Sequence, residues 1–245
     1  MKLPLIIFFS LIIYILGALG YATRYWDCCK PSCAWVGNAG GHLARTCDIN
    51  MSIINDTDAG SKCDGGPATA CLNQIPMVIN ETLAYAFAAS PGYGPNVCGK
   101  CYELKFTGKG KYETKYNHRK LIGKKLIVIS NNIGYDVSGG QFNLQIPGGG
   151  VGTHHGCDGI FFGDLGATYG GLLNDCEDEV GWKGSEKLIY EKRKSCLIKK
   201  CNASFEGVEL AKEGCLFLAN WMEAAGNPYV EYEQVECPKE LLDKY

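Results

Sequence analysis

The run Thr23-Arg24-Tyr25-Trp26-Asp27-Cys28-Cys29-Lys30-Pro31-Ser32-Cys33 is the most informative stretch of the sequence. It sets one aspartate behind two aromatic residues and among three closely spaced cysteines. Three cysteines within the six residues after Asp27 can cross-link this segment and hold the carboxylate in place, and a carboxylate held in place is what acid–base catalysis needs. The stretch therefore predicts a rigid, cross-linked fold around a candidate catalytic aspartate. The alternative is that Asp27 is a buried hydrogen-bond acceptor.

Cysteine and glycine are over-represented along the rest of the chain. The 245 residues include 14 cysteines, an even number spread over the whole length, and 32 glycines. This usage favours complete disulfide pairing in an oxidising compartment and a loop-rich, mainly β protein. A zinc site at Cys98-Gly99-Lys100-Cys101 is the competing explanation, but the sequence offers neither a second such pair nor a histidine pair beside it. We expect no metal and no cofactor.

The N-terminal segment is typical of a secretory signal. Lys2 precedes an uncharged, mostly apolar run, and the small residues Ala18 and Gly20 predict cleavage after Gly20. About 17 apolar residues is near the lower limit for a membrane span, so a signal anchor is the alternative. We expect a signal peptide at residues 1–20 and a secreted protein that leaves the membrane after cleavage. Three glycosylation sequons then become usable, at Asn55, Asn80 and Asn202.

Charge and composition exclude several classes of protein. Lys and Arg number 24 against 26 Asp and Glu, a formal net charge of −2, so the chain lacks the basic field that a nucleic-acid partner requires. With 46% hydrophobic and 20% charged residues, the composition is that of an ordinary globular protein. Without a linker or an internal repeat, residues 21–245 are expected to form one domain, and we expect a monomer.

Short strands separated by glycines dominate the expected secondary structure. Branched or alternating runs predict strands at residues 102–106, 126–130, 142–146 and 229–235. A helix capped by Asn80 is expected to run to Ala89, and a second is expected over residues 210–225. The lysine-rich segment 182–206 shows little periodicity of apolar residues. We therefore expect an irregular surface segment that is closed by a local Cys196–Cys201 disulfide.

A second candidate site lies in the glycine-rich segment 134–152. Asp136 stands on a loop between glycines, followed by a predicted strand and the tract Gly148-Gly149-Gly150, as in a lid over a cleft. The alternative is that Asp136 is a turn residue. The glycine tract lacks the lysine of a phosphate loop, and the sequence has no G-x-S-x-G elbow, so phosphate-binding and serine-hydrolase readings are disfavoured.

Taken together, these residues resemble glycoside hydrolase family 45, the small disulfide-rich β-1,4-glucanases. The run from Ala22 to Asp27, with Cys33 after five further residues, looks like the family signature. The similarity continues through Cys101-Tyr102-Glu103-Leu104, the segment 143–152, Tyr169-Gly170-Gly171 and the segment 234–238. It implies a six-stranded double-psi β-barrel with short helices and long disulfide-braced loops, and no carbohydrate-binding module.

The resemblance also implies a set of disulfides. By it, the cysteines pair 28 with 157, 29 with 63, 33 with 98, 47 with 71, 101 with 237, and 176 with 215. Cys196 and Cys201 fall outside the matched set, which is consistent with the local bridge expected between them.

Members of the family are inverting hydrolases with two catalytic carboxyl groups, one as base and one as acid. By resemblance, Asp27 is the general base and Asp136 is a loop carboxylate that closes over substrate. The position of the general acid holds Asn143, where the family typically has aspartate, and Gln141 stands where relatives can carry histidine. An amide has no acidic proton to give, and losing general-acid assistance costs ~10²–10⁴-fold in rate.

A substitute proton donor is therefore required if the chain hydrolyses glucan. Asp136 is the first candidate, and His154 or His155 is the alternative. For substrate binding, the resemblance points to Thr23 and Tyr25 near the base, and to Trp35 and Tyr169 as aromatic surfaces for sugar rings. We expect an endo-acting, inverting hydrolase of β-1,4-glucan. The alternative is a catalytically silent glucan-binding protein, or a wall-loosening protein resembling expansins.

Overall fold

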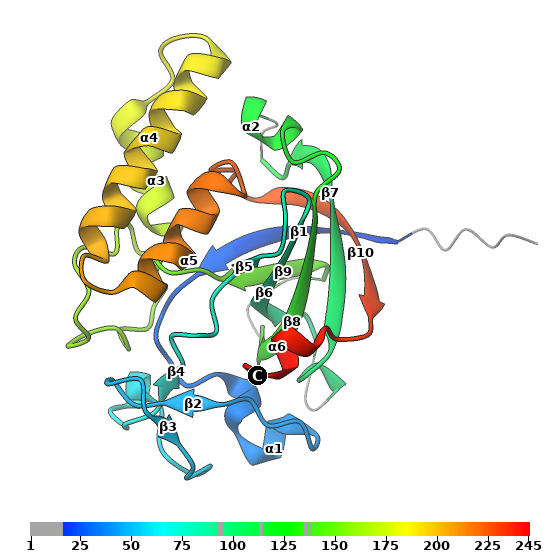
Figure 1. Ribbon diagram of the computed structural model, residues 1–245, viewed down its shortest axis with the longest axis vertical. Coiled ribbons are helices and arrows are strands. Elements are labelled where there is room, and N and C mark those ends of the chain that lie inside the picture. The colour runs from blue at the N-terminus through cyan, green and yellow to red at the C-terminus, as the bar shows by residue number, and fades with distance from the viewer. Residues whose placement is uncertain (1–16, 93–95, 113–114, 135–136, 138) are drawn as a thin grey trace, which may run out of the picture.

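Six strands form the centre of the protein. The computed structural model describes residues 17–92, 96–112, 115–134, 137 and 139–245. The central strands are β1 (Ala18–Tyr25), β6 (Leu83–Ser90), β7 (Cys101–Gly110), β8 (Lys125–Ile133), β9 (Gln141–Gln145) and β10 (Pro228–Val235). Their order is β6-β8-β7-β10-β1-β9, and β9 also pairs with β6, so the sheet closes into a ring (Figure 1). The pairs β6–β8 and β1–β9 are parallel, and the other pairs are antiparallel.

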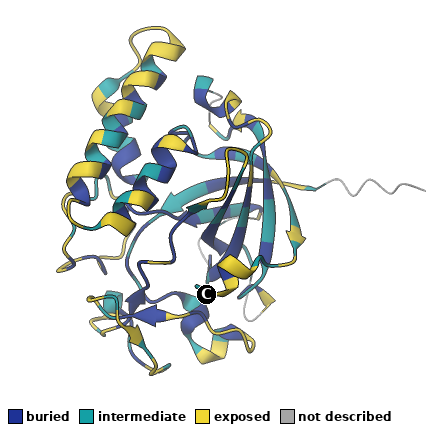
Figure 2. Cartoon of the chain, in the orientation of Figure 1, coloured by how far each residue is buried: buried dark blue, intermediate teal, exposed yellow. Residues whose placement is uncertain are grey.

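Alternating side chains explain why these segments are strands. In β7, Leu104 and Phe106 are buried, while Glu103 and Lys105, which alternate with them, are partly exposed. Leu126 and Phe142 from neighbouring strands are fully buried in the same apolar cluster, and Figure 2 shows this buried interior. The four expected strands are present as parts of β7, β8, β9 and β10, except that Ile146 lies one residue beyond β9. Burial alternates along β7 from Leu104 onward, whereas most residues of β8 are buried.

The segment expected to be a helix from Asn80 to Ala89 is instead strand β6. It pairs in parallel with β8 along its whole length, and its alanines are buried. Alanine favours helices locally, but pairing with two ring strands overrides that preference. Asn80 caps no helix, because its side-chain oxygen accepts the backbone N–H groups of Thr82 and Leu83 in a tight turn.

A small lobe of short elements follows the end of β1. Its three-stranded sheet has the order β3-β2-β4. The lobe contains the 3-10 helices Ser32–Ala34 and Lys62–Asp64, α1 (Val36–Ala39), β2 (Thr46–Cys47), β3 (Ile53–Ile54) and β4 (Thr69–Ala70). Other short elements are β5 (Met77–Val78) on the edge of β6, α2 (Tyr116–Arg119) and α6 (Lys239–Leu242). Disulfides 29–63, 33–98 and 47–71 hold the lobe together and to the ring, so it needs little core of its own.

Three helices form a layer beside the ring. They are α3 (Gly171–Val180), α4 (Glu186–Ser204) and α5 (Glu209–Asn220), and in Figure 1 they stand together on one side of the strands. The protein is therefore mixed α/β, and the expectation of a mainly β protein with short helices is corrected. The helix predicted at 210–225 is present as α5, but it ends earlier, before Glu223 and Ala224 adopt left-handed backbone angles.

The segment 182–206 is a long helix rather than an irregular excursion. Ser185 caps α4, because its hydroxyl accepts a hydrogen bond from the backbone N–H of Leu188. Only a few side chains of α4 are buried, so the sequence shows little helical periodicity of apolar residues. The expected Cys196–Cys201 bridge is also wrong. Residues five apart on a helix are turned by about 140° from each other, so the two cysteines face different neighbours.

The observed bridges join these cysteines to the flanking helices. Cys196 is bonded to Cys176 of α3, and Cys201 to Cys215 of α5, so the implied 176–215 pair is wrong as well. The other five implied disulfides are present, and all 14 cysteines are paired. Both sulfurs of the Cys98/Cys101 pair are bonded to other cysteines rather than offered to a metal.

The end of the expected signal segment belongs to β1. Ala18, Leu19 and Gly20 lie opposite Tyr232, Glu231 and Val230 of β10. The backbone N–H of Tyr21, the next residue, donates to the Gly140 carbonyl at 2.9 Å. Across the part of the chain that the structure describes, no helix has the length and apolar character needed to span a bilayer.

Candidate active site

A cavity of about 800 Å³ lies where the ends of β1, β8 and β9 meet the small lobe. It brings together residues that are far apart in the sequence and that the sequence analysis singled out. Tyr25, Asp27, Trp35, Asn143, His154 and Tyr169 all line it. Thr23 contacts Asn143, whereas His155 is exposed and does not line the cavity. Asp136 lies outside the described residues.

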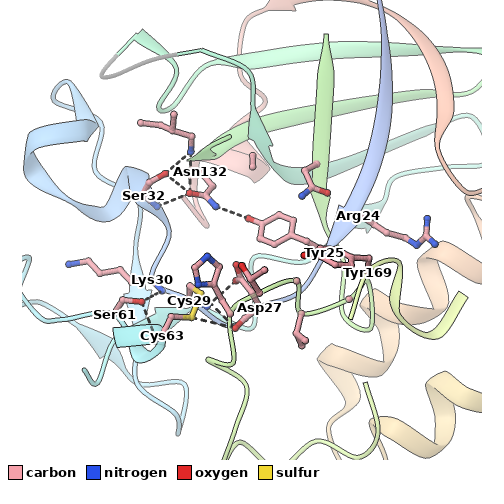
Figure 3. Close-up of a pocket in the computed structure, with 18 of the residues that line it drawn as sticks. Arg24, Tyr25, Asp27, Cys29, Lys30, Ser32, Ser61, Cys63, Asn132 and Tyr169 are labelled. Atoms are coloured by element: carbon pink, nitrogen blue, oxygen red, sulfur yellow. Dashed lines mark hydrogen bonds between the residues drawn. A yellow bond between two sulfur atoms is a disulfide. The ribbon is translucent and has the colours of Figure 1, made fainter. Parts of the chain in front are cut away.

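Asp27 is held by the turn that follows β1. The backbone N–H of Cys29 donates to Asp27 Oδ1 at 3.0 Å, and the next residue, Cys28, has a left-handed φ of 57°. The Cys28–Cys157 and Cys29–Cys63 bridges fix both cysteines after it, and Figure 3 shows the second of these bridges beside Asp27. The half-buried carboxylate is therefore fixed on the cavity wall, as the cysteine pattern predicted.

Glycines let two loops pass close to this turn. A Cβ on Gly149 would lie 2.9 Å from the Tyr25 nitrogen, and one on Gly156 would lie 2.7 Å from the Asp27 carbonyl oxygen. Separations below 3.0 Å are sterically forbidden against backbone, so neither position accepts a side chain. The glycine tract is thus a close backbone passage against β1, and the cavity wall depends on it.

A line of hydrogen bonds between β1 and β9 leads to Asn143. The parallel register sets Tyr21 beside Gln141 and Thr23 beside Asn143. The Tyr21 hydroxyl donates to Gln141 Oε1 at 2.6 Å, Gln141 Nε2 donates to Thr23 Oγ1 at 3.1 Å, and Thr23 Oγ1 donates to Asn143 Oδ1 at 2.8 Å. This order leaves the Asn143 amide N–H groups for the cavity. They can donate a hydrogen bond, but they cannot protonate a leaving group.

Trp35 has one ring face occupied. Lys30 Nζ lies 3.5 Å from the Trp35 ring centroid and also donates to the carbonyl oxygens of Thr57 at 2.7 Å and Ala59 at 2.9 Å. Lys30 is only 5% exposed, and this burial lowers its pKa from the usual value. The half-buried indole is therefore held in place, with a cation on one face.

Tyr25 and Tyr169 add further aromatic surface. The Tyr25 hydroxyl accepts a hydrogen bond from Asn132 Nδ2 at 3.3 Å, whereas Tyr169 is 69% exposed at the rim of the cavity. Arg24 lies behind Tyr169, where its Nε donates to the Gly170 carbonyl at 3.1 Å. Burial lowers the pKa of Arg24 to about 10, so the guanidinium stays charged at neutral pH.

Two further ionisable residues, Asp64 and His154, line the cavity. Asp64 is an exposed carboxylate on the cavity wall, and the sequence analysis did not identify it. It follows Cys63 directly, and the 29–63 disulfide brings it to the same cavity as Asp27. Its place beside that cysteine could therefore have indicated it. His154 places a ring nitrogen within 4.8 Å of the sulfurs of Cys29 and Cys63. Those sulfurs are bonded to each other, so the three residues do not offer the thiolates of a metal site.

The chain is similar to known endoglucanases in sequence and in fold. The model of glycosyl hydrolase family 45 matches residues 19–186. Endoglucanase B of Cellvibrio japonicus is 42% identical over 93% of this chain and 45% of that protein, and a putative endoglucanase type K of Fusarium oxysporum is 41% identical over 91% and 52%. The solved cellulase of the Antarctic springtail Cryptopygus antarcticus superposes with a TM-score of 0.72 at 33% identity, over 93% of this chain and 95% of that one.

The fold and the cavity thus define a disulfide-braced protein with a carboxylate in a cleft. The chain belongs to glycoside hydrolase family 45, which confirms the resemblance found in its sequence. It spans about half the length of the two bacterial and fungal endoglucanases it matches.

Proposed function

We propose that the protein is a secreted, endo-acting hydrolase of β-1,4-glucan, such as cellulose or a related plant cell-wall glucan. Membership of the family and the names of the matched endoglucanases support the substrate class. The observation that carries the proposal is the fixed Asp27 carboxylate in a cavity of about 800 Å³ bordered by Tyr25, Trp35 and Tyr169. Aromatic faces suit the apolar faces of glucose rings, and polar groups between them suit the hydroxyls.

The proposed mechanism is inversion with Asp27 as general base. The carboxylate takes a proton from a water that attacks the anomeric carbon, while a second group on the other side of the sugar protonates the leaving oxygen. In inverting enzymes the two catalytic groups stand ~6.5–9.5 Å apart, which leaves room for the water. Asn143 stands at the position of that acid and donates only a hydrogen bond. We assign the proton to Asp136, with His154 as the alternative because it lines the same cavity.

The proposed organisation follows the same family. The six-strand ring corresponds to a double-psi β-barrel, and residues 21–245 form one catalytic domain that acts as a monomer after removal of residues 1–20. Seven disulfides suit an extracellular location. After cleavage, the Tyr21 nitrogen keeps its hydrogen bond to Gly140 and so anchors the new terminus.

One observation favours a second candidate function. Asn143 lies where an acid is expected, and the hydrogen bond from Thr23 holds its amide in place, so the cavity is suited to bind glucan without cleaving it. A glucan-binding protein without hydrolytic activity, or one that loosens walls as expansins do, would use the same aromatic surfaces.

The deciding experiment is reducing-sugar release by the disulfide-intact protein from soluble cellulose, xyloglucan and mixed-linkage glucan. The blank is Asp27→Ala, and the matched control is Asp158→Asn, which changes an exposed carboxylate that does not line the cavity. We expect release from the parent and the control, and a loss of at least ~10²-fold in the blank. Proton NMR of the first products should show the α-anomer. Glucan binding without release would favour the second candidate, and equal rates in parent and blank would refute Asp27 as base.

A further inference from the structure

A second cavity lies at the other end of strand β6 from the candidate active site. Its volume is about 790 Å³, and Thr82, just before β6, lines it, whereas Ala89 near the end of β6 lines the active-site cavity. A strand rises ~3.3 Å per residue, so the two cavities are separated by about 20 Å along β6. A molecule in the second cavity would therefore leave the first one open.

The second cavity has an apolar rim and an inaccessible aromatic floor. Val78 and Ile122 line it and are 55% and 65% exposed. Trp221 is only 6% exposed, because one face stacks on Phe217 with centroids 5.2 Å apart and Lys124 Nζ lies 5.0 Å from its ring centroid. The indole therefore cannot act as a stacking platform for a free sugar. What remains is exposed aliphatic surface that a covalently held group could cover.

Asn80 lines this cavity, and hydrogen bonds hold both its backbone and its side-chain oxygen. Its Oδ1 accepts three hydrogen bonds, from Thr82 N at 2.9 Å, Thr82 Oγ1 at 3.1 Å and Leu83 N at 2.9 Å. Its backbone N–H donates to the Leu83 carbonyl, and its own carbonyl accepts from Trp221 Nε1, both at 3.0 Å. Asn80 is exposed, and no described residue forms a hydrogen bond with its Nδ2.

We propose that Asn80 carries an N-linked glycan whose first N-acetylhexosamine covers the apolar rim formed by Val78 and Ile122. Asn80-Glu81-Thr82 is an acceptor sequon, and the hydroxyl of Thr82 already contacts the amide oxygen. Nδ2 is the atom that attacks the anomeric carbon of a lipid-diphosphate-linked oligosaccharide. The new C–N bond replaces the bond from that carbon to the phosphate oxygen, the lipid diphosphate leaves, and Nδ2 loses a proton to solvent.

The other two sequons lack this arrangement. In Asn202-Ala203-Ser204, which lies in α4, Ser204 is 5% exposed and its hydroxyl donates to the Asp164 carbonyl instead of the asparagine. Asn55 is exposed, but within the described residues no hydrogen bond joins it to Thr57, whose carbonyl is held by Lys30. The geometry therefore distinguishes Asn80 from two sites that have the same sequence pattern.

The glycan proposal rests on the proposed secretion of the protein, so the test separates failure of glycosylation from failure of secretion. The full chain is produced in a eukaryotic secretory host, once with its own residues 1–20 and once with the host's signal sequence in their place. Glycopeptide mass mapping is then applied to the parent, Asn80→Gln and the matched control Asn55→Gln. We expect sugar on the Asn80 peptide, loss of one glycan in Asn80→Gln, retention in Asn55→Gln, and unchanged glucan-related activity in both. If the protein with its own residues 1–20 stays inside the cells while the protein with the host's signal is secreted, that result counts against the proposed secretion and not against the glycan.

Two further variants and one trimming step test how the sugar is held. Thr82→Ser should keep the glycan and Thr82→Ala should lose it. Trimming to a single N-acetylglucosamine should preserve the melting temperature, whereas complete removal should lower it by about 2–4 °C, and Ile122→Ser should abolish that difference. An unmodified Asn80 in protein produced with the host signal overturns the proposal. A glycan whose complete removal leaves the melting temperature unchanged overturns the seating on the apolar rim.

Discussion

Replacing Asn143 by aspartate tests the proposal that this position lacks a general acid and that the lack limits turnover. The new carboxyl group would take the place of the amide beside Thr23, whose hydroxyl donates to Oδ1 at 2.8 Å. Because a hydroxyl that donates to a carboxylate favours the charged form, the same contact would lower the pKa of the introduced acid. The structure therefore predicts a gain in rate that is smaller than the full value of general-acid catalysis.

The magnitude follows from these two effects. A general acid is worth ~10²–10⁴-fold. A net hydrogen-bond contribution of about 0.5–1.5 kcal/mol corresponds to a pKa lowered by up to about one unit, and so to about a tenfold smaller protonated fraction at higher pH. The remaining gain is ~10–10³-fold, and we expect kcat/KM for soluble cellulose to rise by about 10²-fold.

The assay is the pH dependence of kcat/KM for the parent, Asn143→Asp and the double variant with Thr23→Val. Removing the Thr23 donor raises the pKa of the new acid, so the decline in rate at high pH should move upward by as much as about one unit. Asn132→Asp is the control, because it adds the same charge within the same cavity at another position. If neither the single nor the double variant gains activity, another group already supplies the proton and the reasoning is wrong.

Two other perturbations test the binding surface and the folded state. Lys30→Met removes the cation from Trp35 and should weaken binding of a soluble cello-oligosaccharide by about 2–30-fold in calorimetry, while exposed Lys109→Met should not. Equal affinities would show that Lys30 does not position the indole. His118 accepts the Lys115 backbone N–H at Nδ1 and donates from Nε2 to the Gly226 carbonyl. Burial lowers the pKa of His118 in the folded protein, so the unfolded state binds a proton at higher pH than the folded state does. The free energy of unfolding should therefore fall below pH 6.5, by at most about 1.36 kcal/mol per pH unit, and urea unfolding of His118→Gln should show a shallower fall. The same slope in both proteins would contradict this.

Local sequence patterns predicted the parts of the fold that depend on neighbouring residues. Alternation along residues 102–106 and the mostly apolar, branched run at 126–130 identified β7 and β8, because both strands direct apolar side chains into the core. The same patterns failed for β6, where alanines that favour a helix are packed into the ring by pairing with β8. They failed again for α4, whose exposed surface is so large that little apolar period remains.

The candidate site divides in a similar way. The cysteines around Asp27 and the family signature were sufficient to predict a fixed carboxylate, and the resemblance gave five of the seven disulfides. The partners of Cys196 and Cys201 depended on the direction each side chain takes from α4, which no spacing rule reveals when the helix itself is missed.

The sequence by itself determined the family and the disulfide-rich framework, and it predicts Asp27 as the base and Asn143 at the position of the acid, because each of these is carried by residue identities in short segments. Only the tertiary structure decided which groups share the cavity and what each of them contacts. The hydrogen bonds that lead from Tyr21 to Asn143 follow from the parallel register of β1 with β9, in which the paired residues are 120 positions apart in the chain. Such contacts arise from the closure of the ring, and closure depends on pairings between segments that are distant in the chain.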